Sequence, residues 1–393
     1  MKLLRLVACT LLILSLARFA PAAEELDISH EISVDGWPKP IPVSIAGFGP
    51  EVDATLKFDL TFMGFTFVAA DKARYQISGS DQGRVEGRVL DMVTKKVTLA
   101  KAFTGSTTRS QTHALADDIA HTLTGRPGIA QSKIACKVQP TGYGPGEIFI
   151  ADYDGHNVQP VTSDGVICSS PTWAGPSMLL YNSYKFEKAD IFSHNLTTGA
   201  RKAIARFPGS NMSPSASPDG KRVAMILSKG GSPNLYVADV DGANLKQLTT
   251  TREGESSPCW SPDGKMICFV SRQSGKAALY TVPADGGEMR RLPTAGISNP
   301  TEPDWSPDGK FVVFTANMGG FSICYVPVAG PNRGQATVLA AGEDGVWAPN
   351  SRAVIFSRTK NNQHVLSLLD VPTKQVKDCA RISGHASQAS WAR

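Results

Sequence analysis

The chain has 393 residues, of which 41% are hydrophobic and 19% are charged. This balance is typical of a folded globular protein and excludes a chain that is mainly disordered. The formal net charge is +5, and Lys2, Arg5 and Arg18 lie within the first 22 residues, so the rest carries about +2. A nearly neutral chain gives no reason to expect nucleic acid or an anionic membrane as a partner.

Residues 1–22 have the pattern of a secretory signal peptide. Lys2 and Arg5 form a positive start, Leu6–Ala17 is an apolar core, and Ala20–Ala22 supplies small residues before a cleavage point. The 12 residues of that core are too few to cross about 30 Å of hydrocarbon as a helix. No later stretch is long and apolar enough to span a membrane. We therefore expect an exported protein after removal of residues 1–22.

The remaining cysteines do not form a metal-binding pattern. None of them lies in a Cys-x2-Cys pair, and no histidine follows at zinc-finger spacing. Cys268 and Cys324 lie in apolar, strand-like runs, where cysteine is most often a small buried residue. Export permits disulfides without proving them, so the sequence leaves open the pairing of Cys136, Cys168, Cys259, Cys268, Cys324 and Cys379.

An internal repeat dominates the second two thirds of the chain. Ser257–Gly264 reads Ser-Pro-Cys-Trp-Ser-Pro-Asp-Gly, and Glu302–Gly309 repeats it as Glu-Pro-Asp-Trp-Ser-Pro-Asp-Gly. Weaker copies bring the anchor positions to six, at intervals of 42 to 45 residues: Trp173, Ala216, Trp260, Trp305, Trp347 and Trp391. This period, with short apolar runs between turn signals, predicts a β-propeller with four strands per blade.

The anchor and turn residues have structural explanations. We interpret each anchor Trp as a packing residue between blades, because each blade buries one face against the next. The Asp of each Pro-Asp-Gly turn is interpreted as a turn-former through its own side-chain hydrogen bonds. Residues 145–168 hold the middle of a blade without its start, and the C-terminus holds a start without its middle. We therefore predict five complete blades and a sixth that both ends share, which removes open sheet edges.

Residues 23–135 lack the repeat and are predicted to form a small α/β domain ahead of a propeller over residues 136–393. Ile41–Phe48 is an expected strand, and Val52–Met63 an expected helix. In the second half of this domain, apolar residues at i, i+4 and i+8 predict a helix that Gly125 ends. The expected elements there are the hairpin strands Arg84–Met92 and Val97–Phe103 and the helix Ser110–Thr124.

The chain resembles the TolB family, the periplasmic propellers of the Tol-Pal envelope system. The order of signal peptide, small α/β domain and six-bladed propeller carries the resemblance, together with the local motifs Leu123–Gly125, Ala151–Gly155 and Asn234–Asp239. It implies a scaffold that is not an enzyme, acting as a monomer without a resident cofactor. The resemblance also allows a cation in the central channel, which no ligand cluster in the sequence requires.

The resemblance further implies two protein partners and a role in outer-membrane integrity and constriction during cell division. The peptidoglycan-associated lipoprotein Pal would bind at a propeller mouth, for which we select residues in the loops before the anchors. Those residues are Ser210, Asn211, Ser213, Glu255, Ser256, Thr301 and Glu302. The inner-membrane protein TolA would bind the arm Glu24–Ser33, where we select Glu25, Leu26, Ile28 and Ile32. The arm could instead be a frayed end, and the mouth residues could instead be solvated turn-formers. The sequence does not decide which propeller mouth binds.

No catalytic motif accompanies the propeller. The sequence has no Gly-x-Ser-x-Gly nucleophile elbow, no His-Glu-x-x-His pair and no Gly-x4-Gly-Lys phosphate loop. The histidines are single, and His113 and His121, eight residues apart on the predicted helix, make neither a metal site nor a base dyad. The alternative function is an exported propeller enzyme or sugar-binding protein, which a cluster of acids or histidines at one channel mouth would favour.

Overall fold

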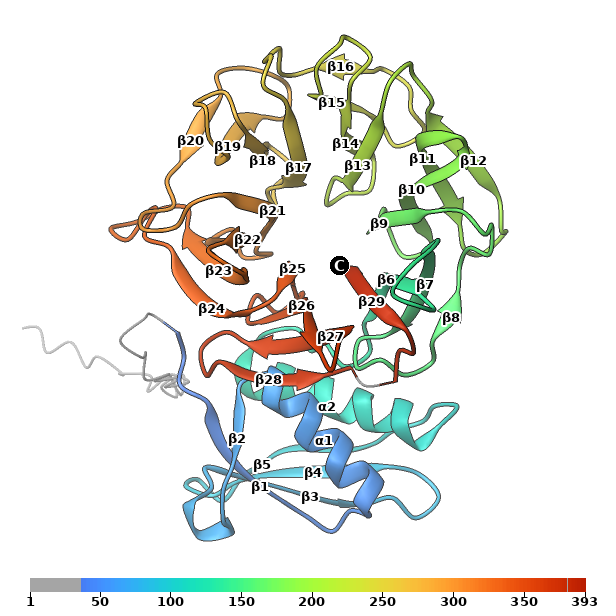
Figure 1. Ribbon diagram of the computed structural model, residues 1–393. Helices are drawn as coiled ribbons and strands as arrows, with labels where there is room; N and C mark the ends of the chain where they lie inside the picture. The colour runs from blue at the N-terminus through green and yellow to red at the C-terminus, as the bar shows by residue number, and fades with distance from the viewer. Residues whose placement is uncertain (1–36, 380) are drawn as a thin grey trace, which may run out of the picture. The chain divides into compact units, whose positions relative to one another are not determined.

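The computed structural model describes residues 37–379 and 381–393. The predicted signal peptide, and the predicted partner-binding residues Glu25, Leu26, Ile28 and Ile32, lie outside the described residues. Pro40–Arg393 forms one compact unit. Within this unit a small α/β domain precedes a six-bladed propeller, as the sequence predicts (Figure 1).

The N-terminal domain contains one five-stranded sheet in the order β2–β1–β3–β4–β5. The predicted strands and the hairpin are confirmed, with slightly different ends. Two strands were not predicted: one is three residues long, and the other ends in Ser-Gly-Ser, so neither shows a run of alternating large apolar residues. The elements are Ile41–Ala46 (β1), Phe65–Phe67 (β2), Ala70–Lys72 (a 3-10 turn), Tyr75–Ser80 (β3), Glu86–Asp91 (β4) and Val97–Ala102 (β5).

Both predicted helices are present and pack against each other. Helix α1 spans Pro50–Phe62, with Pro50 in the first turn, where its missing N–H is not needed. Helix α2 spans Thr108–Thr124, and the Thr107 side chain accepts a hydrogen bond from the Ser110 N–H in a capping box. Gly125 ends α2 at φ 69°, in the left-handed region that glycine adopts without strain.

The described residues also form six four-stranded sheets, the blades of the propeller. Figure 1 shows them around a central opening, with the first strand of each blade innermost. In chain order, the complete blades follow one another, each joined to the next by a loop from its outermost strand. Blade 1 is Cys168–Trp173 (β9), Met178–Phe186 (β10), Lys188–Asn195 (β11) and Arg201–Ala205 (β12); blade 2 is Asn211–Ala216 (β13), Arg222–Leu227 (β14), Asn234–Asp239 (β15) and Lys246–Gln247 (β16); blade 3 is Glu255–Trp260 (β17), Met266–Ser271 (β18), Ala278–Pro283 (β19) and Arg290–Leu292 (β20); blade 4 is Pro300–Trp305 (β21), Phe311–Asn317 (β22), Phe321–Pro327 (β23) and Thr337–Ala341 (β24); blade 5 is Glu343–Trp347 (β25), Ala353–Lys360 (β26), Gln363–Asp370 (β27) and Gln375–Asp378 (β28).

Blade 6 joins the two ends of the propeller, which confirms the predicted clasp. Its innermost strand is the last of the chain, His385–Trp391 (β29), and the other three are Lys133–Gln139 (β6), Glu147–Asp152 (β7) and Gln159–Pro160 (β8). Strand β6 pairs with β29 on one side and with β7 on the other from its first residues onward. The propeller therefore begins at Lys133, and the boundary expected at residue 135 falls inside β6.

The alternation of strand directions gives the propeller two distinct faces. We call start face the side on which the inner strands begin, at Cys168, Asn211, Glu255, Pro300, Glu343 and His385. We call turn face the opposite side, where the Ser-Pro-Asp-Gly turns follow the inner strands. The turns between the third and fourth strands of each blade, counted from the channel, also lie on the turn face. Tyr153–Gly155, between β7 and β8 of blade 6, is one of them.

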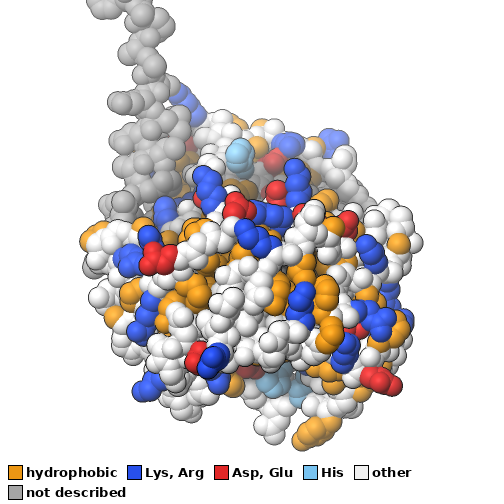
Figure 2. Space-filling view, turned by 90° about the horizontal axis from the view of Figure 1, so that it is seen from above, with side chains coloured by type: hydrophobic (Ala, Val, Ile, Leu, Met, Phe, Trp, Pro, Cys, Tyr) orange, Lys and Arg blue, Asp and Glu red, His pale blue; other side chains and the backbone are white. Residues whose placement is uncertain are grey.

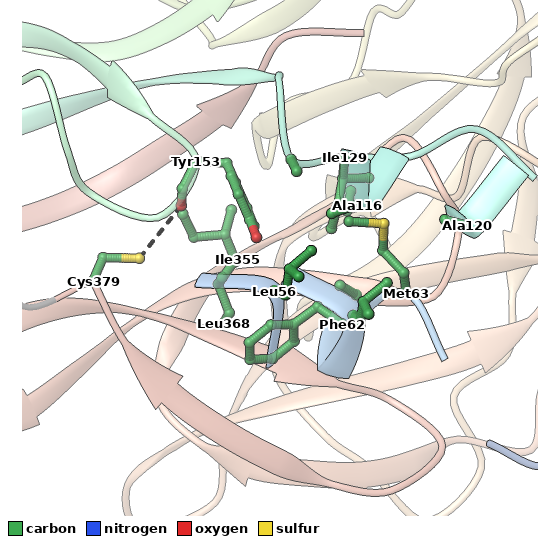
Figure 3. Packing of buried hydrophobic residues seen from close by; sticks show 14 of the residues in the cluster. Leu56, Phe62, Met63, Ala116, Ala120, Ile129, Tyr153, Ile355, Leu368 and Cys379 are labelled. Carbon is green, nitrogen blue, oxygen red and sulfur yellow. Dashed lines mark hydrogen bonds between the residues drawn. The ribbon is translucent and has the colours of Figure 1, made fainter. Parts of the chain in front are cut away.

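One hydrophobic core runs from the N-terminal domain into blades 5 and 6. Leu56, Phe62 and Ala116 of the helices belong to the same buried cluster as Ile355 and Leu368 of blade 5 (Figure 3). The Asn350 side chain, in the first turn of blade 5, donates to the Phe62 carbonyl at 2.9 Å. The N-terminal domain is thus attached at turn-face loops of blades 5 and 6, and its helices exclude water from that contact.

The anchor tryptophans and the cysteines are packing residues, as predicted. Trp260, Trp305, Trp347 and Trp391 are buried. Trp173 is only partly buried. The six cysteines after residue 22 are all free and buried, which answers the pairing that the sequence left open.

Candidate functional site

The inner strands of all six blades surround a central channel cavity of about 760 Å³. Its wall repeats one short pattern. In each inner strand a polar residue lies three positions before the anchor, and a proline or a small residue follows it. Four of the six copies have proline there, which has no N–H to give to the sheet ladder. All of these polar residues line the cavity: Ser170, Ser213, Ser257, Glu302, Asp344 and Gln388.

Each of these six residues has a left-handed backbone, with φ between 50° and 56°. In every blade, the register between the first and second strands shifts at this position, as in a β-bulge. Non-glycine residues adopt this conformation rarely, so six equivalent instances identify a feature of the repeat. At three of these bulges, the side chains of Glu302, Asp344 and Gln388 reach the neighbouring blade.

On one side of the channel, these side chains form a relay of hydrogen bonds between blades. Glu302 Oε2 accepts from the Asp344 N–H at 3.3 Å, and Asp344 Oδ2 accepts from the Gln388 N–H at 3.0 Å. Gln388 Oε1 then accepts from the Ser170 N–H at 3.0 Å. The relay links blades 4, 5, 6 and 1 and therefore crosses the clasp. We name it the inter-blade relay.

The opposite side of the channel carries short side chains instead. Ser213 and Ser257 occupy the equivalent positions of blades 2 and 3, and a serine is too short to reach the next backbone N–H. The Ser213 N–H is bonded to Asn182 Oδ1 of blade 1, at 3.0 Å. The channel wall is therefore asymmetric, with carboxylates and an amide on one side and hydroxyl groups on the other.

Acidic and histidine side chains converge at the start face beside the relay. Burial and the neighbouring carboxylate of Asp344 raise the pKa of Glu302 to about 7. His364 Nδ1 lies 3.5 Å from Glu343 Oε1, and the ring centres of His364 and His385 are 5.9 Å apart. This is the kind of cluster that the alternative function calls for. Glu302 and Asp344 each accept a hydrogen bond from a backbone N–H of the next blade. These bonds connect neighbouring blades of the ring.

The predicted mouth residues separate into three groups. Ser213 and Glu302 line the channel. Ser210 is exposed at the start face, and Ser256 and Thr301 are partly buried beside it. Asn211 and Glu255 are buried inside their blades, although the sequence selected them for a partner surface. Asn211 donates to two backbone carbonyl groups at 3.1 Å, and Glu255 accepts from Thr251 and Ser271. Polar residues at strand starts satisfy the loop backbone, which their spacing alone does not reveal.

The Ser-Pro-Asp-Gly turns are built as the sequence predicts. Ser261 Oγ donates to Asp263 Oδ1 at 2.6 Å, and Asp263 Oδ1 accepts from the Lys265 N–H at 3.1 Å. The same bonds recur in the turns that contain Asp219 and Asp308. These aspartates are turn-formers, and their carboxylates are already committed on the turn face.

A buried ionic network joins the N-terminal domain to blade 6, and the sequence did not reveal it. His113 of α2 contacts Asp59 of α1 at 2.8 Å through Nδ1 and Asp154 of the blade 6 turn at 3.4 Å through Nε2. Tyr153 Oη donates to Asp59, and Arg109 pairs with Asp154. We name these five residues the junction network.

The protonation states of the junction network follow from burial and charge. Burial alone would lower the pKa of His113, but the hydrogen bonds to Asp154 and Asp59 raise it to about 9. His113 and Arg109 hold the pKa of the Asp154 carboxyl well below its usual range, against the effect of burial. His113 is therefore a cation at neutral pH. In the sequence His113 is a single histidine on a predicted helix, and its partners lie 54 and 41 residues away in the chain.

The comparisons with known proteins agree with this architecture. A family model described as "TolB beta propeller domain" matches residues 120–393. The Tol-Pal system protein TolB of Alcanivorax borkumensis is 29% identical over 222 residues, which cover 54% of this chain and 50% of the relative. A protein TolB homolog of Chlamydia pneumoniae is 32% identical over 139 residues, which cover 34% of this chain and 32% of the relative. The chain thus spans half or less of the length of these curated relatives.

A solved structure resembles the whole arrangement. The crystal structure of TolB from Acinetobacter baumannii has a TM-score of 0.80 at 23% identity and covers 90% of this chain and 97% of its own. At that identity the likeness establishes the fold. The fold and the repeated channel wall define a six-bladed propeller protein with an N-terminal α/β domain. Because the family model covers more than half of the chain, the chain belongs to the TolB β-propeller family.

Neither helix of residues 37–379 combines the length and hydropathy that a membrane span requires.

Proposed function

We propose that this chain is the propeller component of a Tol-Pal cell-envelope system and that it acts in the periplasm as a protein-binding scaffold. The observation that carries the proposal is the family match over residues 120–393. The names of the relatives, "Tol-Pal system protein TolB", and the shared order of the two domains support it. The partners follow from that assignment: Pal at the propeller, and TolA at the segment Glu24–Ser33. Through them the chain would support outer-membrane integrity and constriction during division.

The start face is the side of the propeller that we propose for Pal. The N-terminal domain is attached at turn-face loops of blades 5 and 6, so the start-face mouth lies on the side away from these contacts. On the serine side of that mouth, Ser213 lines the channel and stays partly accessible. The side chains there are small and the opening is concave, so a side chain of the partner could insert into it.

A binding measurement with one matched control tests the proposal. The probe is the anchor-free domain of the Pal-type lipoprotein from the same organism, titrated calorimetrically. The wild-type chain should bind it, and Ser213→Arg should weaken binding at least about tenfold, because a long cation would fill the mouth. Ser274→Arg, an exposed position in a blade 3 loop of the same face, should leave affinity unchanged.

The outcomes separate the assignment from the location. No binding by the wild-type chain would contradict the Pal partnership. Binding that Ser213→Arg does not affect, in a variant with wild-type unfolding, would move the site away from this mouth. The arm has its own test: deletion of Glu24–Ser33 should abolish TolA binding while Pal binding persists. A Pal-type lipoprotein gene beside this one would favour the scaffold over an exported enzyme.

A further inference from the structure

Exposed apolar side chains are distributed unequally over the molecule. Ten large apolar residues of the described chain expose more than about a third of their surface, and seven of them lie at start-face loops or strand ends of the propeller. Two others are in the N-terminal hairpin, and one is on an outer strand. The seven are Tyr143, Ile167, Tyr184, Phe186, Met212, Met318 and Phe321, with exposures from 37% to 91%.

Five of the seven belong to three consecutive blades, and we name them the apolar arc: Tyr143, Ile167, Tyr184, Phe186 and Met212. They come from the middle loop of blade 6, the loop that enters blade 1, the middle hairpin of blade 1 and the start of blade 2. Met318 and Phe321 are apart from them in blade 4. Large contiguous apolar patches on soluble proteins mark interaction sites.

Hydrogen bonds tie the segments of the arc together. The Cys168 N–H, next to Ile167, donates to the Gly146 carbonyl of the blade 6 loop at 2.7 Å. The Tyr184 N–H donates to the Ile167 carbonyl at 3.0 Å. The backbone segments that carry the arc residues are therefore joined from blade 6 into blade 1.

The connection continues into blade 2. Asn182, two residues before Tyr184, donates to the Asn211 carbonyl at 2.8 Å and accepts from the Ser213 N–H at 3.0 Å. These two bonds hold the backbone on both sides of Met212 against blade 1. The arc therefore extends from blades 6 and 1, where the inter-blade relay ends, to the serine side of the channel in blade 2.

The charges around the arc select the partner. Lys185 and Lys229 are exposed, and Arg206 lies over the Phe186 ring with its guanidinium 4.0 Å from the ring centre. Of the acids in these loops, Asp190 is fully buried against Arg206, Asp164 pairs with Arg201 and Lys185, and Glu187 is exposed. The exposed cations Lys185, Arg206 and Lys229 outnumber Glu187, so the balance of charge on this side is positive. On the outer edge of the ring that Figure 2 shows, Lys and Arg side chains are scattered more widely, so charge alone does not mark the arc.

We propose that the apolar arc is the docking surface for the protein partner at the start face, and that this partner presents apolar side chains flanked by carboxylates. The inference rests on the proposed function and makes it more specific: the partner sits off the propeller axis, over blades 6, 1 and 2. Apolar burial supplies the affinity, and the lysines around the arc steer an acidic partner onto it.

The test compares two pairs of substitutions on the same face, using the anchor-free Pal-type lipoprotein as the probe. Tyr143→Ser with Ile167→Ser removes two arc residues, and both are exposed enough to spare the fold. Met318→Ser with Phe321→Ser is the control pair, with similar exposure and chemistry in blade 4. We expect the arc pair to lose at least about tenfold in affinity and the control pair to stay within about twofold.

A charge test accompanies it. Lys185→Glu with Lys229→Glu should weaken binding at least about fivefold at low salt, and the loss should shrink as salt rises. Wild-type affinity in the arc pair, or equal losses in both pairs, would overturn the off-axis docking surface. Unchanged affinity in the lysine pair would overturn an acidic partner. If the wild-type chain does not bind the lipoprotein, both the proposed function and this inference are wrong. If the wild-type chain binds but the arc and lysine variants bind equally well, only this inference is wrong.

Discussion

The junction network makes the stability of the molecule depend on pH in a defined direction. The pKa of His113 is about 9 in the folded chain and 6.5 when unperturbed. A difference of this size corresponds to about 3 kcal/mol of folding free energy, since each pKa unit is worth about 1.36 kcal/mol. His113 binds its proton more tightly when folded. Its contribution is therefore complete below pH 6.5 and is lost as the pH rises toward 9.

We expect His113→Gln to remove this contribution. The free energy of unfolding of the wild-type chain should exceed that of His113→Gln most at pH 6, and the difference should shrink by about 3 kcal/mol by pH 9.5. The assay is urea unfolding of both proteins at a series of pH values, followed by tryptophan fluorescence. Taking the difference between the proteins cancels the titration of lysines and tyrosines that they share.

His121→Gln is the control, because His121 lies exposed on the same helix, outside the network. Its effect on the free energy of unfolding should be small, because an exposed side chain gains few contacts on folding. A wild-type advantage over His113→Gln that stays constant between pH 6 and 9.5 would refute the argument, because it would mean that His113 carries no extra proton in the folded chain.

Three further predictions concern the contacts that hold the ring and its domain together. Asn350→Ala removes the bond to Phe62 and the acceptor of two buried N–H groups, and should lower the free energy of unfolding by about 1–3 kcal/mol, measured in urea. Asp344→Ala leaves the Gln388 N–H without its acceptor and should cost about 1–3 kcal/mol, whereas Asp344→Asn keeps an oxygen there and should cost less; equal losses would contradict the relay. Deletion of Gly384–Arg393 removes β29 from blade 6 and should lower the melting temperature clearly; a cooperative transition at the wild-type temperature would show that the clasp is dispensable.

The repeat explains why the propeller could be predicted from the sequence. The Trp anchor and the Pro-Asp-Gly turn recur at intervals of 42 to 45 residues. The repeat can therefore be recognised even where a single copy departs from the pattern. The split blade was predictable for the same reason, because Ile148–Asp152 and Trp391 each match one half of the repeat unit. Helix α2 was equally clear from its apolar period and from Gly125.

Tertiary structure alone decided where the polar side chains go. Asn211 and Glu302 look alike as polar residues before an anchor, yet Asn211 is buried against loop carbonyl groups and Glu302 reaches the next blade. The difference depends on the left-handed bulge and on the distance to a neighbouring blade, and neither is visible in one repeat unit. The junction network joins His113 to Asp59 and Asp154 through packing of separate elements, because desolvation and charge act through space and not along the chain.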